Sequence, residues 1–141
     1  MAVTANSIIS PQKTVFFKCV ATTADVAWNA PVNMVTLIDE TVGGNNDNGL
    51  RLRRIIAITR ATITTNPINC ALYHKVGSVY TLIDSVLIQP VTPSAQVANG
   101  KADFGYSDDD PLELAAGVGL AFAIGTTTAN GIVCHARGGA Y

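Results

Sequence analysis

The chain has 141 residues and a mass of 14.7 kDa, enough for one compact domain with or without a short arm. It is 48% hydrophobic but only 13% charged, with a net charge of −1, which excludes a disordered chain and disfavours a phosphate-binding nucleic-acid partner. No apolar run approaches the roughly 18 residues of a membrane span, and the first residues lack a signal-peptide pattern, so no membrane association is expected.

Short β-type segments separated by turn signals follow one another along the chain, and no helical periodicity stands out. Residues 1–12 are mostly small and polar and predict an extended N-terminal arm, in which Ile8 and Ile9 are candidate contacts to a partner. Residues 13–141 are expected to form a single domain. Alternation and short apolar runs predict eight strands, at residues 13–20, 34–39, 50–65, 70–75, 79–89, 112–114, 120–124 and 132–137.

The predicted strands indicate an all-β fold of two packed antiparallel sheets, because each sheet must bury one apolar face. Loops are expected at residues 43–49, which are rich in Gly and Asn, and at residues 90–101, which contain two prolines. Eight strands with some long crossings favour a jelly roll, and an immunoglobulin-like sandwich is the alternative.

The cysteines and histidines do not have the spacing of a metal site. Cys70 and His74 would share a strand face but lie about 13 Å apart, at roughly 3.3 Å per residue, too far to bind one ion. Cys134 and His135 are adjacent, so their side chains would point to opposite faces. Without a C-x-x-C pair or a nucleophile signature, we expect no metal, no cofactor and no enzymatic activity.

Three cysteines are an odd number, so they cannot all pair within one chain. Cys19 shares a predicted strand face with Val15 and Phe17, which favours a place in the core. Cys134, near the C-terminus, is the first candidate for an intermolecular disulfide. Cys70, which follows an Asn-Pro-Ile-Asn turn, is the second candidate.

Arg51, Arg53 and Arg54 form the only cluster of basic residues. On a regular strand Arg51 and Arg53 would share one face and Arg54 would point away, so one common patch is not expected. Arginine suits bidentate contacts with carboxylates, which makes the three residues candidate contacts to a neighbouring subunit. A solvated strand end is the alternative.

Three further features have a structural and a functional interpretation. The run Asp108 to Asp110 could hold calcium, but a solvated turn before the next strand is favoured. Trp28 could be a carbohydrate-stacking platform, but with so few aromatic residues a plug at the sandwich edge is favoured. The pair Gly138 and Gly139 lacks the setting of a phosphate loop, so turn chemistry is expected there.

Two stretches carry a resemblance to a known family. The start, Met-Ala-Val-Thr-Ala-Asn-Ser-Ile-Ile-Ser-Pro-Gln, resembles that of small virion proteins encoded among the structural genes of tailed bacteriophages. The stretch from Asp103 to Leu114, continuing to Leu120, is similar to a second signature of that family. The resemblance covers most of the chain and implies a capsid decoration or minor capsid protein. Such proteins are commonly β-rich, bind the assembled shell and often form trimers.

The resemblance leads to a definite functional expectation. The chain is expected to bind and stabilise the phage major capsid protein shell, with its arm reaching a neighbour, as part of a homo-oligomer on the capsid surface. It would be made in the host bacterial cytoplasm, and disulfides through Cys134 or Cys70 would form later. The scarcity of charge would reflect faces shared with neighbours. The alternative is a tail-fibre or adsorption-apparatus module that binds a host glycan.

Overall fold

The computed structural model describes residues 11–40 and 45–141 and is built entirely from strands and their connections. Within these residues there are nine strands: β1 (Lys13–Ala21), β2 (Val35–Ile38), β3 (Leu50–Thr59), β4 (Ile68–Val76), β5 (Val79–Ile88), β6 (Lys101–Asp103), β7 (Leu112–Leu114), β8 (Gly119–Ile124) and β9 (Ile132–Ala140). All eight predicted strands are present. The unpredicted strand is β6, which is only three residues long, and β3 ends at Thr59 instead of continuing to Thr65.

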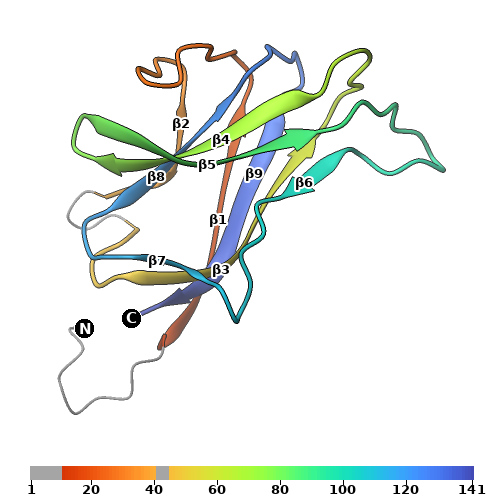
Figure 1. The fold of residues 1–141 in the computed structure, drawn as a ribbon. Coiled ribbons are helices and arrows are strands. Elements are labelled where there is room, and N and C mark those ends of the chain that lie inside the picture. Colours follow the sequence, from red (N-terminus) through yellow and green to blue (C-terminus); the bar gives the residue numbers. More distant parts are fainter. Residues whose placement is uncertain (1–10, 41–44) are drawn as a thin grey trace.

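The strands form two antiparallel sheets that pack face to face as a sandwich (Figure 1). The first sheet has the order β1-β9-β3-β6, with β7 also paired to β3, and the second has the order β2-β8-β4-β5. β6 and β7 pair with opposite ends of β3, so together they occupy one edge position. With that pair counted as one strand, the order is that of a jelly roll and differs from the immunoglobulin-like alternative.

The main core lies between the two sheets. Its largest members come from β3, β4 and β8 and include Leu52, Ile55, Leu72, Phe122 and Ile124, all with 0% exposure. Every residue of β8 is buried, because this strand is covered on its outer face as well. That double burial explains why β8 is a continuous apolar run in the sequence.

The outer face of the second sheet is covered by the connection between β1 and β2. Trp28 and Met34 from this connection pack against a small cluster centred on Tyr73 and Ala121. The Tyr73 hydroxyl donates a hydrogen bond to the carbonyl oxygen of Trp28 at 2.9 Å. Trp28 therefore covers a sheet face, whereas the sequence favoured a plug at the sandwich edge.

A β-bulge interrupts the pairing of β3 with β9. Leu52 lies opposite Gly138 and Arg54 lies opposite Arg137, which leaves Arg53 as an extra residue in β3. Leu52 and Ile55 both point into the core, so Arg53 and Arg54 both lie on the outer face. The expectation that Arg54 points away from Arg51 and Arg53 is wrong, because a bulge breaks the alternation of side chains.

The two glycines near the end of β9 allow this local arrangement. A Cβ atom on Gly138 would overlap the carbonyl oxygen of Arg51, and one on Gly139 would overlap the Pro11 ring. Both glycines lie within β9 and pair with β1 and β3. The turn expected at Gly138–Gly139 is therefore wrong. Glycine is needed at position 138 because the backbone of β3 approaches too closely for a side chain, and at position 139 because the Pro11 ring occupies the space.

We expect the Gly138→Ala substitution to lower the free energy of unfolding by about 1–3 kcal/mol, because the new methyl group must push β3 away from β9. Urea unfolding followed by circular dichroism measures this change. Gly125→Ala is a matched control, since its Cβ would meet its nearest atoms at 3.5 Å, an ordinary contact. Equal destabilisation by both substitutions would contradict the close approach at the bulge.

Candidate functional site

Most of the cations of the chain lie on one surface, the outer face of the β1-β9-β3-β6 sheet, which we call the basic face. Strand pairing and side-chain alternation place six of the nine Lys and Arg residues there: Lys18, Arg51, Arg53, Arg54, Lys101 and Arg137. The same pairing places Asp103 and Glu113 on this face, so its strands carry six cations against two carboxylates, and a protein with a net charge of −1 has a locally positive surface. Such a local field attracts acidic partners and repels basic ones.

Two of these arginines form ion pairs at the surface. The Nε atom of Arg51 lies 2.6 Å from a carboxylate oxygen of Glu113, and that of Arg54 lies 3.5 Å from one of Asp103. Within the described part of the chain, Arg53 and Arg137 form no ion pair. Exposed ion pairs contribute little to stability, so exchanging them for other carboxylates costs little. All four guanidinium groups, paired and unpaired, are therefore available to a partner's carboxylates.

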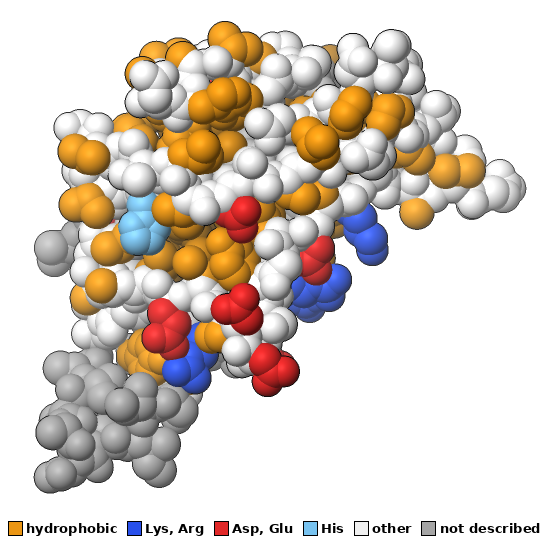
Figure 2. Space-filling model, viewed as in Figure 1, with side chains coloured by type: hydrophobic (Ala, Val, Ile, Leu, Met, Phe, Trp, Pro, Cys, Tyr) orange, Lys and Arg blue, Asp and Glu red, His pale blue; other side chains and the backbone are white. Residues whose placement is uncertain are grey.

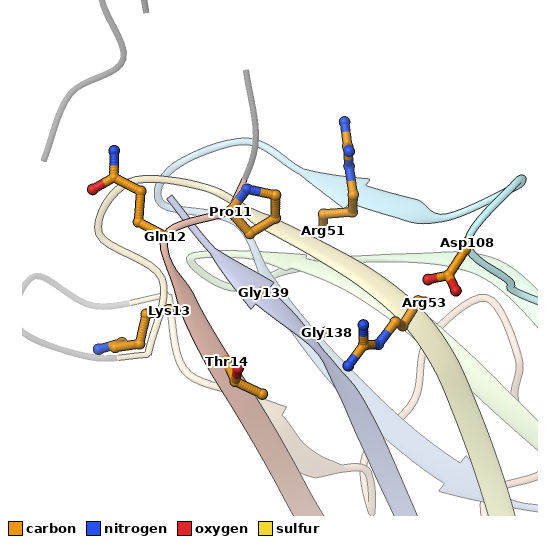
Figure 3. Close-up of a pocket in the computed structure, with 9 residues that line it drawn as sticks. All are labelled: Pro11, Gln12, Lys13, Thr14, Arg51, Arg53, Asp108, Gly138 and Gly139. Carbon is orange, nitrogen blue, oxygen red and sulfur yellow. The ribbon is translucent and has the colours of Figure 1, made fainter. Parts of the chain in front are cut away.

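A hollow of about 430 Å³ lies at the end of the basic face where the described chain begins. It is lined by Pro11, Gln12, Lys13, Thr14, Arg51, Arg53, Asp108, Gly138 and Gly139 (Figure 3). In this view Arg53 extends from β3 to β9 beside Gly138, whereas Arg51 and Lys13 point away from the hollow. The bare backbone at Gly138 and Gly139 keeps the hollow open.

A second hollow of about 400 Å³ adjoins the first one. It is lined by Arg53, Arg54, Asp103, Tyr106, Ser107, Asp108 and Arg137, so Arg53 and Asp108 belong to both hollows. We call these two neighbouring hollows together the arginine groove. Planar guanidinium groups on two adjacent strands suit carboxylates, because each group can donate two parallel hydrogen bonds.

An exposed aromatic side chain stands beside the arginine groove. Phe16 in β1 is 57% exposed and lies opposite Arg137 of β9. Its ring stacks on His135, with ring centroids 5.3 Å apart and planes 21° apart. Aromatic and arginine side chains together are typical of the residues that dominate protein–protein binding energy.

The environment of His135 disfavours its protonated form. Burial lowers the pKa of its imidazole, and the positive charges of Arg137 and Arg54 lower the pKa further. Within the described residues the buried Nδ1 atom has no hydrogen-bond partner. His135 therefore stays neutral to a lower pH in the folded protein than in the unfolded chain, whose imidazole binds a proton near the ordinary pKa of 6.5.

From this we expect stability to fall as the pH drops from about 7 to about 5.5, because the unfolded state takes up the proton of His135 first. The substitution His135→Phe keeps a ring that can stack on Phe16 and removes the titrating group. Urea midpoints measured across this range should change less for the variant than for the parent chain. If the urea midpoints of the two proteins change equally with pH, His135 does not contribute to the pH dependence of stability.

All three cysteines are free and buried. Cys70 and Cys134 have no exposed surface. Cys19 in β1 lies directly opposite Cys134 in β9. Burial raises the pKa of Cys70 to about 12, and burial followed by a hydrogen bond with Cys19 raises the pKa of Cys134. An intermolecular disulfide through Cys134 or Cys70 is therefore not supported, because a thiol inside the core cannot reach a second chain.

A thiol-reactive dye tests this placement. Under native conditions the three thiols should react at least a hundredfold more slowly than in denatured chain, because all three are buried and burial raises the pKa of the Cys70 and Cys134 thiols. The rate is followed by absorbance with 5,5′-dithiobis(2-nitrobenzoate). Rapid modification of Cys134 or Cys70 in the folded protein would restore the disulfide expectation.

The remaining candidates from the sequence lie in different places. Asp108 to Asp110 form a turn in which the Asp110 amide donates to the Ser107 hydroxyl, and Asp108 lines the arginine groove. No group of three or more metal-ligating side chains occurs among residues 11–40 and 45–141. Ile8 and Ile9, with most of the predicted arm, lie outside the described residues.

Sequence reasoning missed Arg137, Phe16 and His135 as members of the site. It also separated Arg54 from the other two arginines. One signal was present: two consecutive arginines stand between the core positions Leu52 and Ile55, where strict alternation would bury one charge. An unpaired buried charge is costly, so that pattern is itself an indication of a bulge.

Comparison of the chain with protein-family models, curated proteins and solved structures finds no match. In the part of the chain that the structure describes, there is no helix with the length and apolar character needed to cross a membrane. The basic face offers a positive surface groove with an exposed phenylalanine beside it. Its chemistry fits the recognition of acidic protein side chains.

Proposed function

We propose that this chain is a structural virion protein, a minor capsid or decoration protein that binds and stabilises the major capsid protein shell of a tailed bacteriophage. The observation that carries the proposal is the arginine groove, which lies where the N-terminal arm joins the sandwich. Acidic side chains on the assembled shell are the partner chemistry. The family resemblance of residues 1–12 and 103–120 supports the same role.

The mechanism is thermodynamic linkage and involves no reaction. A protein that binds the assembled shell, but not its dissociated subunits, stabilises the shell by mass action. The sheet presents the arginine groove, and the arm with Ile8 and Ile9 supplies a second attachment, joined to the sandwich through Pro11 and Gln12 beside the groove. Two linked contacts raise the effective affinity of each copy. In this role the chain is located on the outer capsid surface after synthesis in the host cytoplasm, and it needs no cofactor.

A glycan-binding module of a tail fibre is the second candidate, since jelly rolls serve as lectins as well as capsid proteins. It would need an open aromatic platform or a calcium site. Trp28 packs over Tyr73 and Ala121, so it does not offer such a platform. The exposed Phe16 stands beside Arg137, which fits an acidic protein surface better than a neutral sugar.

Charge reversal in the arginine groove tests the proposed function. We expect the double substitution Arg53→Glu and Arg137→Glu to weaken binding to decoration-free shells at least tenfold, about 1.4 kcal/mol, because carboxylates would then face carboxylates. Binding is measured by co-sedimentation of the purified chain with the shells over a range of salt concentrations. Wild-type binding should also weaken as salt rises.

Arg60→Glu is the matched control, because Arg60 lies outside the basic face, with its Nε donating to the Asn130 carbonyl. This variant should bind like the wild type. If the wild-type chain does not bind shells at all, the decoration function is wrong. If the control loses as much affinity as the double variant, the function stands and the arginine groove is not the contact surface.

A further inference from the structure

Two of the three cysteines face each other across neighbouring strands. Cys19 in β1 lies directly opposite Cys134 in β9, and both side chains belong to the main core between the sheets. Cys134 has no exposed surface, and Cys19 is 9% exposed. A hydrogen bond joins the two thiols, so the side chains meet as well as the backbones. The register thus brings together two thiols that stand near opposite ends of the sequence.

The separation of directly opposite residues fits a disulfide. Their Cα atoms lie roughly 4.5–5.5 Å apart in an antiparallel pair, depending on the hydrogen-bonding position. A disulfide spans Cα separations of roughly 4.4–6.8 Å, so either kind of pair is within its range. A bond between Cys19 and Cys134 therefore needs rotation of the two side chains and a small approach of the strands, with no change of register.

Cys70 is placed differently from the other two. It lies in β4 of the second sheet, and its thiol donates a long hydrogen bond of 3.9 Å to the carbonyl oxygen of Ile68 in the same strand. Sheets that pack face to face stand about 10 Å apart, whereas a disulfide cannot bridge Cα atoms more than about 7 Å apart unless the backbone moves. The fold therefore favours one pairing, Cys19 with Cys134, and leaves Cys70 as the unpaired thiol.

We propose that Cys19 and Cys134 form an intramolecular disulfide when the folded chain meets a low-molecular-weight disulfide such as oxidised glutathione. The thiolate of Cys19 attacks the oxidant, which forms a mixed disulfide and releases one glutathione thiolate. The thiolate of Cys134 then attacks the sulfur of Cys19 and releases the second glutathione thiolate. The protein loses two electrons and two protons, and one molecule of oxidised glutathione becomes two molecules of glutathione.

The edge position of β1 allows this reaction in the folded protein. Within residues 11–40 and 45–141, β1 pairs only with β9, whereas β9 has a strand on each side. An edge strand opens locally more easily than a central strand, because fewer backbone hydrogen bonds must break. Cys19 is the more exposed of the two cysteines, so a small oxidant reaches it first. Burial and the hydrogen bond with Cys19 raise the pKa of Cys134, which makes closure of the bond slow.

The disulfide would fasten the edge of the basic face. β1 carries Phe16 and Lys18, and its position in the sheet depends on its pairing with β9. A bond between Cys19 and Cys134 closes most of the chain into one loop, and long loops restrict the unfolded state the most. The oxidised chain should therefore melt about 10 °C above the reduced chain. This inference rests on register and burial and does not require the proposed virion role.

Peptide mapping tests the pairing on the full wild-type chain. Reduced protein, freed of reductant, is incubated with oxidised glutathione under native conditions, and is then denatured and treated with iodoacetamide. One thiol, that of Cys70, should be alkylated, and the peptides that contain Cys19 and Cys134 should stay joined until a reductant separates them. Three alkylated thiols, a bond that involves Cys70, or glutathione retained on Cys19 would each overturn the inference.

The same treatment of urea-denatured chain is the matched control for the role of the fold. In an unfolded chain short loops close more readily than long ones, so bonds from Cys70 to either of the other cysteines should outnumber the pairing of Cys19 with Cys134. If that pairing is no more frequent in the folded chain than in the denatured chain, the fold does not select it and the inference is wrong.

Melting temperatures of the oxidised and reduced forms, measured by circular dichroism, test whether the bond suits the sheet. Cys70→Ala keeps the pair and removes the third thiol, so oxidation should raise its melting temperature by the same amount, about 10 °C, as that of the wild type. Cys19→Ala removes the pair and should show no such rise. If oxidation leaves the wild-type melting temperature unchanged or lowers it, the two positions are not placed for a disulfide. The wild-type comparison stands even where a variant does not fold.

Discussion

The bulge at Arg53 determines which side chains the protein presents on its most charged surface. Without the extra residue, strict alternation after Leu52 would direct Arg54 toward the core and Ile55 toward solvent. With it, Leu52 and Ile55 both pack inside while Arg53 and Arg54 join Arg51 and Arg137 outside. Gly138 permits this arrangement because its place opposite the bulge has no room for a Cβ atom. The arginine groove thus depends on a strand defect and on the glycine across from it.

The scarcity of charge is better understood as an uneven distribution. Most of the cations lie on the basic face, while the connections at residues 22–34, 60–67, 89–100 and 125–131, at one end of the sandwich, contribute one exposed charge, Arg60. The upper part of the face in Figure 2 accordingly shows hydrophobic and uncharged side chains, whereas the acidic and basic ones lie lower down. The two surfaces suit different partners. A positive surface attracts an acidic surface from a distance and loses affinity with salt, whereas an uncharged apolar surface depends on close fit. In the proposed virion role the basic face is the contact with the shell.

Burial also decides between two roles of the cysteines that the sequence cannot distinguish, a disulfide between chains and a place in the core. An odd cysteine count is compatible with a bond between chains and with three core thiols. Cys134 and His135 are adjacent on a strand, so their side chains point to opposite faces of the sheet. The sequence does not say which of the two faces the core. Pairing with β1 on one side and β3 on the other turns Cys134 inward, where packing holds it against the core.

The sequence by itself determined the all-β class, eight of the nine strands and the two-sheet architecture, because alternation, β-branched residues and Gly- and Pro-rich turns act locally. It also located three of the four arginines that line the groove. The tertiary structure decided the register, and with it which neighbours share a face; the consecutive arginines indicate the bulge only once Leu52 and Ile55 are known to lie in the core. Register depends on cross-strand partners that are distant in the chain: Arg54 meets Arg137, and Cys19 meets Cys134. No local pattern specifies such pairs, and surface charge and thiol burial follow from them.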